Sequence, residues 1–147
     1  IIREIINFEP DNKATNIDCA LHFMTEAIKK KCAAFLISDF IDDGDYSKSM
    51  TIANRKHDLT AIQVYDKRDS KMPDVGLVRV VDSETGKETW IDTSSKRVRQ
   101  LYDKAWYERQ QRLYSITAKS GVDIASVATD EDYVKSLLGL FKKRSIH

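Results

Sequence analysis

Several features that mark common classes of protein are missing from this sequence. No apolar run approaches the ~20 residues that a membrane-spanning helix needs, and no stretch has the hydrophobic core of a signal peptide. Lys and Arg together number 24 against 23 for Asp and Glu, and the net charge is +1. Acids and bases are interleaved, so the chain lacks the strongly basic face of a nucleic-acid binder. We therefore expect neither a membrane span nor a nucleic-acid partner.

Cysteine and glycine motifs are also sparse. The two cysteines, Cys19 and Cys32, are too few for a disulfide framework, and their spacing matches no zinc pattern. We expect both to be small core residues of a reduced, cytoplasmic protein. No glycine-rich phosphate loop is present, which argues against nucleotide binding. His22 and His57 have no Ser or Cys nucleophile in a recognisable local setting, so a hydrolase triad is poorly supported.

What the sequence does contain is the alternation of helices and strands that is typical of an α/β protein. Apolar runs predict parallel strands at 33–40, 59–65 and 122–128, and the first run is continuous enough to predict a strand covered on both faces. Helical spacing predicts helices at 1–8, 15–31, 47–56 and 94–119, and a final helix capped by Asp130. Strand, helix and strand with short joints indicate a right-handed parallel crossover.

A β-hairpin interrupts this alternation. The strands Leu77–Val81 and Glu88–Asp92 flank a turn at 82–87, in which Gly86 supplies the positive φ. The long helix that follows ends at Gly121, the expected C-cap residue. We interpret residues 1–147 as a single α/β domain with a Rossmann-like parallel sheet and an added β-hairpin.

Acidic residues follow the predicted parallel strands, at the sheet edge where ligands of open α/β sheets collect. Asp39, Asp66 and Asp130 occupy these positions. Asp39 is the strongest candidate for a functional site, because it follows an apolar run and would be partly desolvated. A hard cation bound through oxygen is one natural partner for it, and the N–H groups of its own loop are an equally weighted alternative. Thr129 and Asp130 are interpreted more simply as a helix cap.

The loop after Asp39 is rich in carboxylates, with Asp42, Asp43 and Asp45. An EF-hand alignment fails, because Ile41 falls on a ligand position. We interpret this cluster as a solvated loop. Two alternatives stay open: a Mg²⁺-dependent phosphotransfer enzyme or nuclease that uses Asp39, Asp42 and Asp43, and a purely structural domain in which these acids are caps.

Several segments are similar to a known family. Ala14-Thr15-Asn16-Ile17 before a helix, and an apolar strand that ends at Asp39, resemble the von Willebrand factor A domain. Further segments resemble the C-terminal part of a bacterial family that carries such a domain, the domain of unknown function fifty-eight, in a Bacteroides-type style. These segments are 55–59, 64–66, 72–77, 82–86, 90–95 and 126–134.

The resemblance implies a von Willebrand factor A-type sheet with a metal-ion-dependent adhesion site. Thr15 matches the threonine of that site, and Asp39 matches its final aspartate. The Asp-x-Ser-x-Ser segment after the family's first strand has no counterpart, because the similar letters at 45–49 follow the Asp39 strand instead. Metal-binding relatives also carry Gly where this chain has Phe40. We therefore expect the C-terminal portion of such a domain, truncated at its N-terminus. Mg²⁺ is then expected in the full-length protein, and weak or no binding in this fragment.

The resemblance also implies a role. Members of the family tend to be encoded beside MoxR-type AAA+ ATPases and other A-domain proteins. We therefore expect a non-enzymatic protein-interaction module that acts with such an ATPase in complex assembly or stress tolerance, including aerotolerance. Loss of the first strands would leave the strand from Ala33 to Phe40 as a sheet edge. We expect this edge to be covered by another copy's strand, a route to self-association, or by the N-terminal helix.

Overall fold

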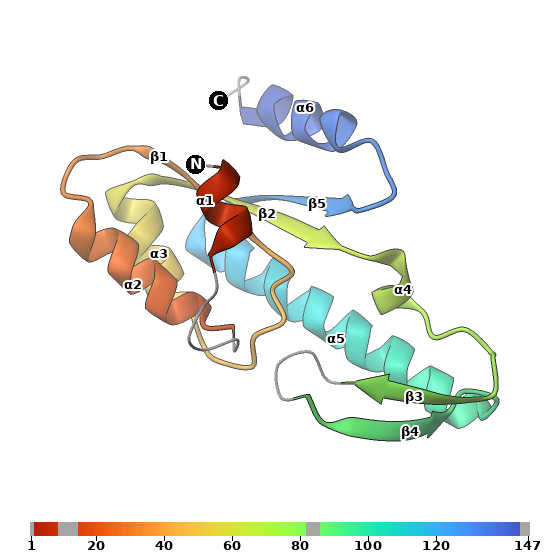
Figure 1. Ribbon diagram of the computed structural model, residues 1–147. Helices are drawn as coiled ribbons and strands as arrows, with labels where there is room; N and C mark the ends of the chain where they lie inside the picture. Colours follow the sequence, from red (N-terminus) through yellow and green to blue (C-terminus); the bar gives the residue numbers. More distant parts are fainter. Residues whose placement is uncertain (1, 9–14, 82–85, 145–147) are drawn as a thin grey trace.

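Helices and strands alternate along the chain in the computed structural model, which describes residues 2–8, 15–81 and 86–144 (Figure 1). The elements are, in order, α1 (Ile2–Asn7), α2 (Ile17–Ala27), β1 (Ala33–Ser38), α3 (Ser47–Lys56), β2 (Asp58–Tyr65), α4 (Lys67–Ser70), β3 (Leu77–Val81), β4 (Glu88–Asp92), α5 (Lys96–Ser120), β5 (Asp123–Ala128) and α6 (Tyr133–Arg144). No helix in the described ranges is long and apolar enough to cross a bilayer.

A three-stranded parallel sheet in the order β1-β2-β5 lies at the centre of the fold. Ala61 of β2 lies opposite Leu36 of β1 and Ile124 of β5. The helix α3 connects β1 to β2, as the crossover prediction requires. The mixed α/β architecture and the parallel sheet confirm the prediction of a Rossmann-like α/β fold.

One face of the sheet packs against α2, α3 and α5. The side chains that form this core are Ile17, Leu21, Phe40, Tyr46, Met50, Ala53, Leu59, Ala61, Leu113, Ile116 and Val122. Full burial of an aliphatic or aromatic side chain stabilises a fold by about 1.5–3 kcal/mol, so this cluster holds the three helices on the sheet. All three helices belong to the segments in which helical spacing was predicted.

The opposite face of the sheet is covered by α6, and only in part. Arg144 donates hydrogen bonds to Asp58 and Thr60 of β2, and the Phe141 ring meets Phe35 of β1 edge to face at 6.3 Å. Phe35 and Ile37 nevertheless remain 49% and 63% exposed. The prediction that this strand is covered on both faces is therefore wrong, because α6 lies over β2 and β5 and leaves the outer part of β1 open.

The free edge of β1 is a related feature. Within the described residues β1 pairs with β2 alone. In Figure 1, α1 lies in front of the sheet, but it forms no strand beside this edge. The described chain therefore presents a row of backbone N–H and C=O groups that another strand could pair with.

The hairpin forms as predicted (Figure 1), and a cleft lies between it and α5. Gly86 has φ +69°, which confirms the positive φ, whereas 82–85 fall outside the described residues. Gly121 closes α5 in the left-handed region, with φ +67°, as predicted. Only the C-terminal half of α5 enters the core, through Leu113 and Ile116. Leu101 has the helical spacing of an inward-facing residue, but it is 58% exposed because the N-terminal half of α5 extends beyond the core.

Two helix ends differ from the predictions. The helix α2 ends at Ala27, because the backbone of Ile28 is extended, so the lysines at 29–31 lie outside it. The helix α6 begins at Tyr133, and the Asp132 carboxylate accepts the N–H of Val134. The prediction that Asp130 caps this helix is therefore wrong, because Asp132 occupies that position.

Candidate functional site

Asp39 follows β1 at the carboxyl end of the parallel sheet, as predicted. Its Oδ1 accepts the backbone N–H of Ile41 at 3.1 Å, and the Ser38 hydroxyl accepts the N–H of Phe40 at 3.0 Å. These two bonds turn the chain sharply out of the sheet. They show that loop N–H groups occupy at least one Asp39 oxygen, which is the alternative role that the sequence left open.

Phe40 is held in an unusual backbone conformation. Its φ is +58°, in the left-handed region that costs a residue with a Cβ roughly 1–2 kcal/mol. Its side chain is buried, and its ring lies 6.5 Å from that of Tyr46. Burial of the ring offsets the strain of the backbone. Strained residues concentrate at functional sites, so Phe40 adds weight to the position beside Asp39.

Asp42 joins the loop after β1 to the start of α2, which carries Thr15 two residues before its first turn. The Asp42 Oδ2 accepts the N–H of Ile17 at 2.7 Å, and its Oδ1 accepts the N–H of Gly44 at 2.7 Å. Both oxygens of Asp42 are thus committed to backbone groups. This carboxylate brings together the loops that contain Thr15 and Asp39, so the prediction that Asp42 belongs to a solvated loop is wrong.

Arg112 of α5 fixes the same loop from the other side. Its guanidinium donates to the carbonyl oxygens of Asp42 at 3.3 Å, of Asp43 at 3.2 Å and of Gly44. Three carbonyls of consecutive residues therefore point at one side chain. The role of Arg112 could not be predicted from the sequence, because an arginine on a helix carries no sign of the loop that it contacts.

Asp45 caps α3. Its Oδ1 accepts the N–H of Ser47 at 3.0 Å and the Ser47 hydroxyl at 2.7 Å, and these bonds hold the pKa of Asp45 below its ordinary value of 3.8. The hydroxyl of Ser49 donates to Asp18 of α2 at 2.6 Å. The segment whose letters match Asp-x-Ser-x-Ser therefore makes helix-end and interhelix contacts.

A cleft of about 670 Å³ lies beside Asp39, between the loop after β1, the hairpin and α5. Its lining residues are Asp39, Ile41, Asp43, Asp69, Val80, Val81, Lys87, Thr89, Ile91, Tyr102 and Arg109. Carboxylates, cations and aliphatic side chains thus share one concave surface at the carboxyl end of the sheet, where ligands of such folds bind.

Tyr102 and Arg109 give the α5 wall of the cleft its polar character. Burial raises the pKa of Tyr102, the charge of Asp69 raises it further, and the guanidinium of Arg109 lowers it. The Nε atom of Arg109 is buried, and in the described part of the chain it has no hydrogen-bond partner. Neither residue was predicted as part of a site.

The two other strand-end acids have structural partners. Asp66 caps α4 by accepting the N–H of Arg68 at 2.8 Å. Asp130 lies 3.2 Å from the ammonium of Lys67, whose pKa is raised by hydrogen bonds to Glu131 and Asp130. Of the three predicted positions, only Asp39 lines the cleft.

The cysteines and histidines form no hydrolase triad among the residues that the structure describes. His57 is buried, and its Nδ1 lies 3.4 Å from the Sγ of Cys32. Cys19 is exposed and Cys32 half-buried, so the prediction that both are core residues is wrong. His22 lies 3.8 Å from Asp18 on the surface of α2.

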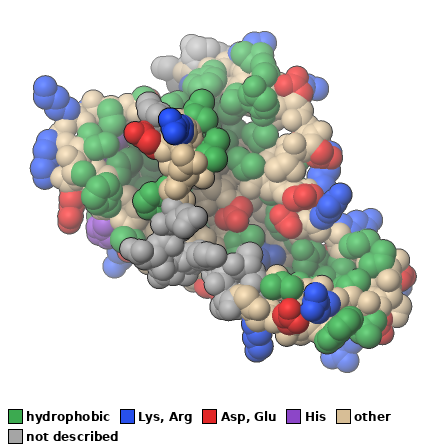
Figure 2. All heavy atoms as spheres, in the orientation of Figure 1, with side chains coloured by type: hydrophobic (Ala, Val, Ile, Leu, Met, Phe, Trp, Pro, Cys, Tyr) green, Lys and Arg blue, Asp and Glu red, His purple; other side chains and the backbone are tan. Residues whose placement is uncertain are grey.

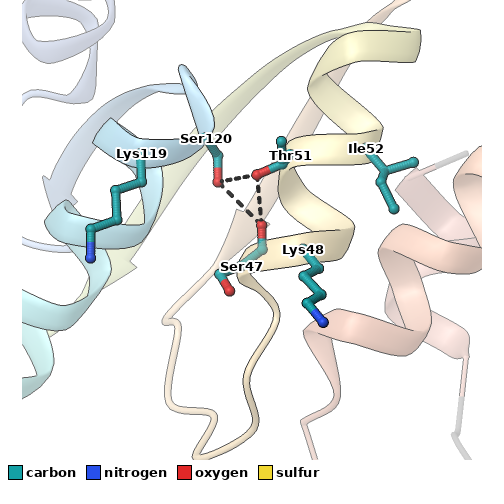
Figure 3. Close-up of a pocket in the computed structure, with 6 residues that line it drawn as sticks. All are labelled: Ser47, Lys48, Thr51, Ile52, Lys119 and Ser120. Atoms are coloured by element: carbon teal, nitrogen blue, oxygen red, sulfur yellow. Dashed lines mark hydrogen bonds between the residues drawn. The ribbon is translucent and has the colours of Figure 1, made fainter.

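A second, shallower pocket of about 370 Å³ lies between α3 and α5 (Figure 3). Its hydroxyl groups bond to the helices themselves: Thr51 donates to the Ser47 carbonyl at 2.9 Å and to the Ser120 hydroxyl at 3.1 Å. Lys48 and Lys119 extend from its two sides (Figure 3). Because these hydroxyl groups already have hydrogen-bond partners within the protein, we interpret them as groups that hold α3 and α5 together.

Comparisons with known proteins place the chain among proteins whose roles are not described. A family model described as "Protein of unknown function DUF58" matches residues 1–112. The uncharacterized protein MAV169 of Mycobacterium avium is 28% identical over 118 residues, which cover 79% of this chain and 68% of the relative. The uncharacterized proteins Mb1516 of Mycobacterium bovis and Rv1480 of Mycobacterium tuberculosis are each 26% identical over 118 residues, and the match covers 36% of their length. No solved structure matches the chain significantly.

Proposed function

This chain belongs to the DUF58 family of proteins of unknown function, and from that premise we propose that it is a non-enzymatic protein-interaction module of a von Willebrand factor A-like protein. The observation that carries the proposal is the cleft at the carboxyl end of the sheet, with Asp39 in its wall. The cleft lies between the loop after β1 and the hairpin, so part of a partner protein could enter it from the surface.

Exposed hydrophobic side chains on the hairpin support a protein as that ligand. Leu77, Val81 and Trp90 alternate with polar residues on one face of β3 and β4, and all three are more than half exposed. Figure 2 shows hydrophobic side chains gathered over the hairpin and over the region of α6. Val80, Thr89 and Ile91 on the other face of the hairpin line the cleft, so Leu77 and Trp90 offer a second exposed apolar surface on the opposite face. Exposed apolar surface of this kind is typical of protein-binding sites.

The geometry favours this proposal over a Mg²⁺-dependent phosphotransfer enzyme or nuclease. That alternative requires the carboxylates of Asp39, Asp42 and Asp43 to converge. Asp39 and Asp43 both line the cleft, whereas Asp42 binds two backbone N–H groups. The described residues contain no group of three or more acids, histidines or cysteines that could hold a metal ion.

The lack of such a group among the described residues also concerns the Mg²⁺ ion of the metal-ion-dependent adhesion site. Thr15 and Asp39 supply at most two side-chain ligands among the described residues, and one Asp39 oxygen already accepts the N–H of Ile41. The remaining positions of a six-coordinate Mg²⁺ would be left to water or to further protein ligands. We propose that Mg²⁺ binds only in a longer polypeptide that adds further ligands. Within the described residues the outer edge of β1 is unpaired, and additional strands of a von Willebrand factor A-type sheet would lie there.

The partner that we propose is a MoxR-type AAA+ ATPase or another A-domain protein in the cytoplasm, in complex assembly or stress tolerance. The family resemblance supports this choice. Pairing of a second copy with the β1 edge is the alternative contact, supported by the exposure of Phe35 and Ile37.

The test is binding of a longer polypeptide that contains this chain to a MoxR-type AAA+ ATPase of the same organism, measured by biolayer interferometry with and without Mg²⁺. Asp39→Ala is expected to weaken binding at least tenfold while the melting temperature stays close to that of the wild type. Asp130→Ala is the matched control, because Asp130 also follows a parallel strand but pairs with Lys67 at 3.2 Å and does not line the cleft. Equal binding by wild type and Asp39→Ala would falsify the proposal.

A further inference from the structure

Arg109 is a cation of the cleft without a partner in the described residues. Its guanidinium forms no ion pair there, and its Nε is buried with no acceptor. An unsatisfied buried donor costs about 1–3 kcal/mol, and more for a charged group. Placing the Arg109 side chain in the cleft therefore lowers the stability of the fold. Such a cost is expected for a group whose hydrogen bonds are completed by a bound ligand.

Residues of the chain itself are poorly placed to satisfy Arg109. Asp103 has a buried Oδ1 that also lacks a partner, but it lies six positions away on the same helix. Helical side chains meet at spacings of three and four, so these two point to different sides of α5. Asp39, Asp43 and Asp69 line the same cleft, yet none is within ion-pair distance of the guanidinium.

The surroundings select the kind of anion that fits. A guanidinium presents a planar pair of N–H donors, which matches the two oxygens of a carboxylate. Three carboxylates in the lining disfavour a doubly charged phosphate more than a singly charged carboxylate. Val80 and Ile91 of the hairpin provide an aliphatic wall for the methylene groups of an acidic side chain.

We propose that Arg109 binds the carboxylate of an aspartate or glutamate side chain that a protein partner inserts into the cleft. The inference rests on the proposed function, since it names the chemistry of the partner at the same site. It requires no metal ion, because the guanidinium supplies the positive charge and the directional hydrogen bonds.

The experiment uses this chain without metal and follows the Nε–Hε signal of Arg109 by ¹H–¹⁵N NMR. The probe is N-acetylglutamate methylamide, which carries one carboxylate, and the uncharged probe is N-acetylglutamine methylamide. We expect saturable movement of the Arg109 signal with the acid and none with the amide. Arg109→Gln is expected to weaken binding of the acid, followed through backbone amides of the cleft, at least tenfold, and Arg109→Lys to weaken it by a smaller factor.

Arg79→Gln is the matched control, because Arg79 lies on the hairpin and pairs with Glu88 at 3.3 Å outside the cleft lining. Its affinity for the acid should equal that of the wild type. An Arg109 signal that ignores the acid, or that responds equally to the amide, overturns the proposal. A tighter saturable response to inorganic phosphate overturns the choice of a carboxylate. The titration of the wild-type chain shows whether Arg109 binds a carboxylate even where a variant fails to fold. Its outcome does not depend on the Asp39→Ala binding test.

Discussion

The carboxylate of Asp42 accepts the backbone N–H of Ile17 at 2.7 Å, across 25 positions of the sequence. The same side chain accepts the N–H of Gly44, and a Cβ at position 44 would lie 2.9 Å from its Oδ1. One acid therefore shapes its own loop and satisfies the first turn of α2. The relative positions of the Thr15 and Asp39 loops depend on it.

Replacing Asp42 by alanine should destabilise the fold. Loss of an N-terminal capping side chain costs about 0.5–2 kcal/mol, and here the Gly44 bond is lost with it. Urea unfolding followed by circular dichroism measures the change. Asp43→Ala is the control, since the Asp43 carboxylate forms no hydrogen bond or ion pair with described residues, and it should change stability by less than about 0.5 kcal/mol. Equal losses in both variants would contradict the assigned role of Asp42.

Glycine should be better tolerated than alanine at position 40. Both substitutions remove the buried Phe40 ring, at a cost of about 3–5 kcal/mol, but only glycine relieves the left-handed backbone. We expect Phe40→Gly to be more stable than Phe40→Ala by about 1 kcal/mol. Unfolding midpoints of the two variants measure the difference.

Phe35 provides the opposite case for that comparison. It lies within β1, where glycine costs backbone entropy, so Phe35→Gly should be less stable than Phe35→Ala. The same order of stability at both positions would show that Phe40 carries no backbone strain.

Arg112→Ala should loosen the loop after β1. Three carbonyl oxygens lose their donor, and we expect a loss of about 1–3 kcal/mol in unfolding free energy. Amide hydrogen exchange of residues 42–46 should quicken more than that of β2. Arg97 is the control, an exposed arginine of the same helix that has no partner in the described residues, and Arg97→Ala should leave both measurements unchanged. Unaltered exchange in Arg112→Ala would show that the loop holds its shape without the guanidinium.

Acid should weaken the fold in part through Asp45. Hydrogen bonds from Ser47 hold the pKa of Asp45 below the ordinary 3.8, so its folded form prefers the charged state. Its contribution is fully present above the unfolded pKa and is lost as the pH falls through the folded pKa. Asp45→Asn should therefore flatten the decline of stability below about pH 4. A variant that declines as steeply as the wild type would exclude this contribution.

Local patterns predicted much of the fold, and long-range packing decided the rest. The helix at 47–56 and both hairpin strands match their predicted bounds, because spacing, turn chemistry and neighbouring residues all favoured the same elements. The open face of β1 was not predicted, since an apolar run does not show where α6 will lie. Its Phe35 and Ile37 look the same in sequence as buried residues.

The candidate site, like the fold, could be predicted only in part from the sequence. Asp39 could be found, because a carboxylate after an apolar strand marks the sheet edge where ligands bind. Phe40 carried a signal too, through the glycine of metal-binding relatives. Arg109 and Arg112 could not be found, because only the path of α5 past the hairpin and the loop after β1 brings Arg109 to the cleft and Arg112 to the carbonyl groups of that loop.

The strand order β1-β2-β5 also bears on how the molecule assembles in time. Residues 39–57 separate β1 from β2, whereas 66–122 separate β2 from β5, a connection about three times as long. Closing the longer connection costs about 1 kcal/mol more in chain entropy, so the β1–α3–β2 unit is the natural nucleus. We therefore expect β5 and α6 to pack onto the β1–α3–β2 unit after that unit has formed.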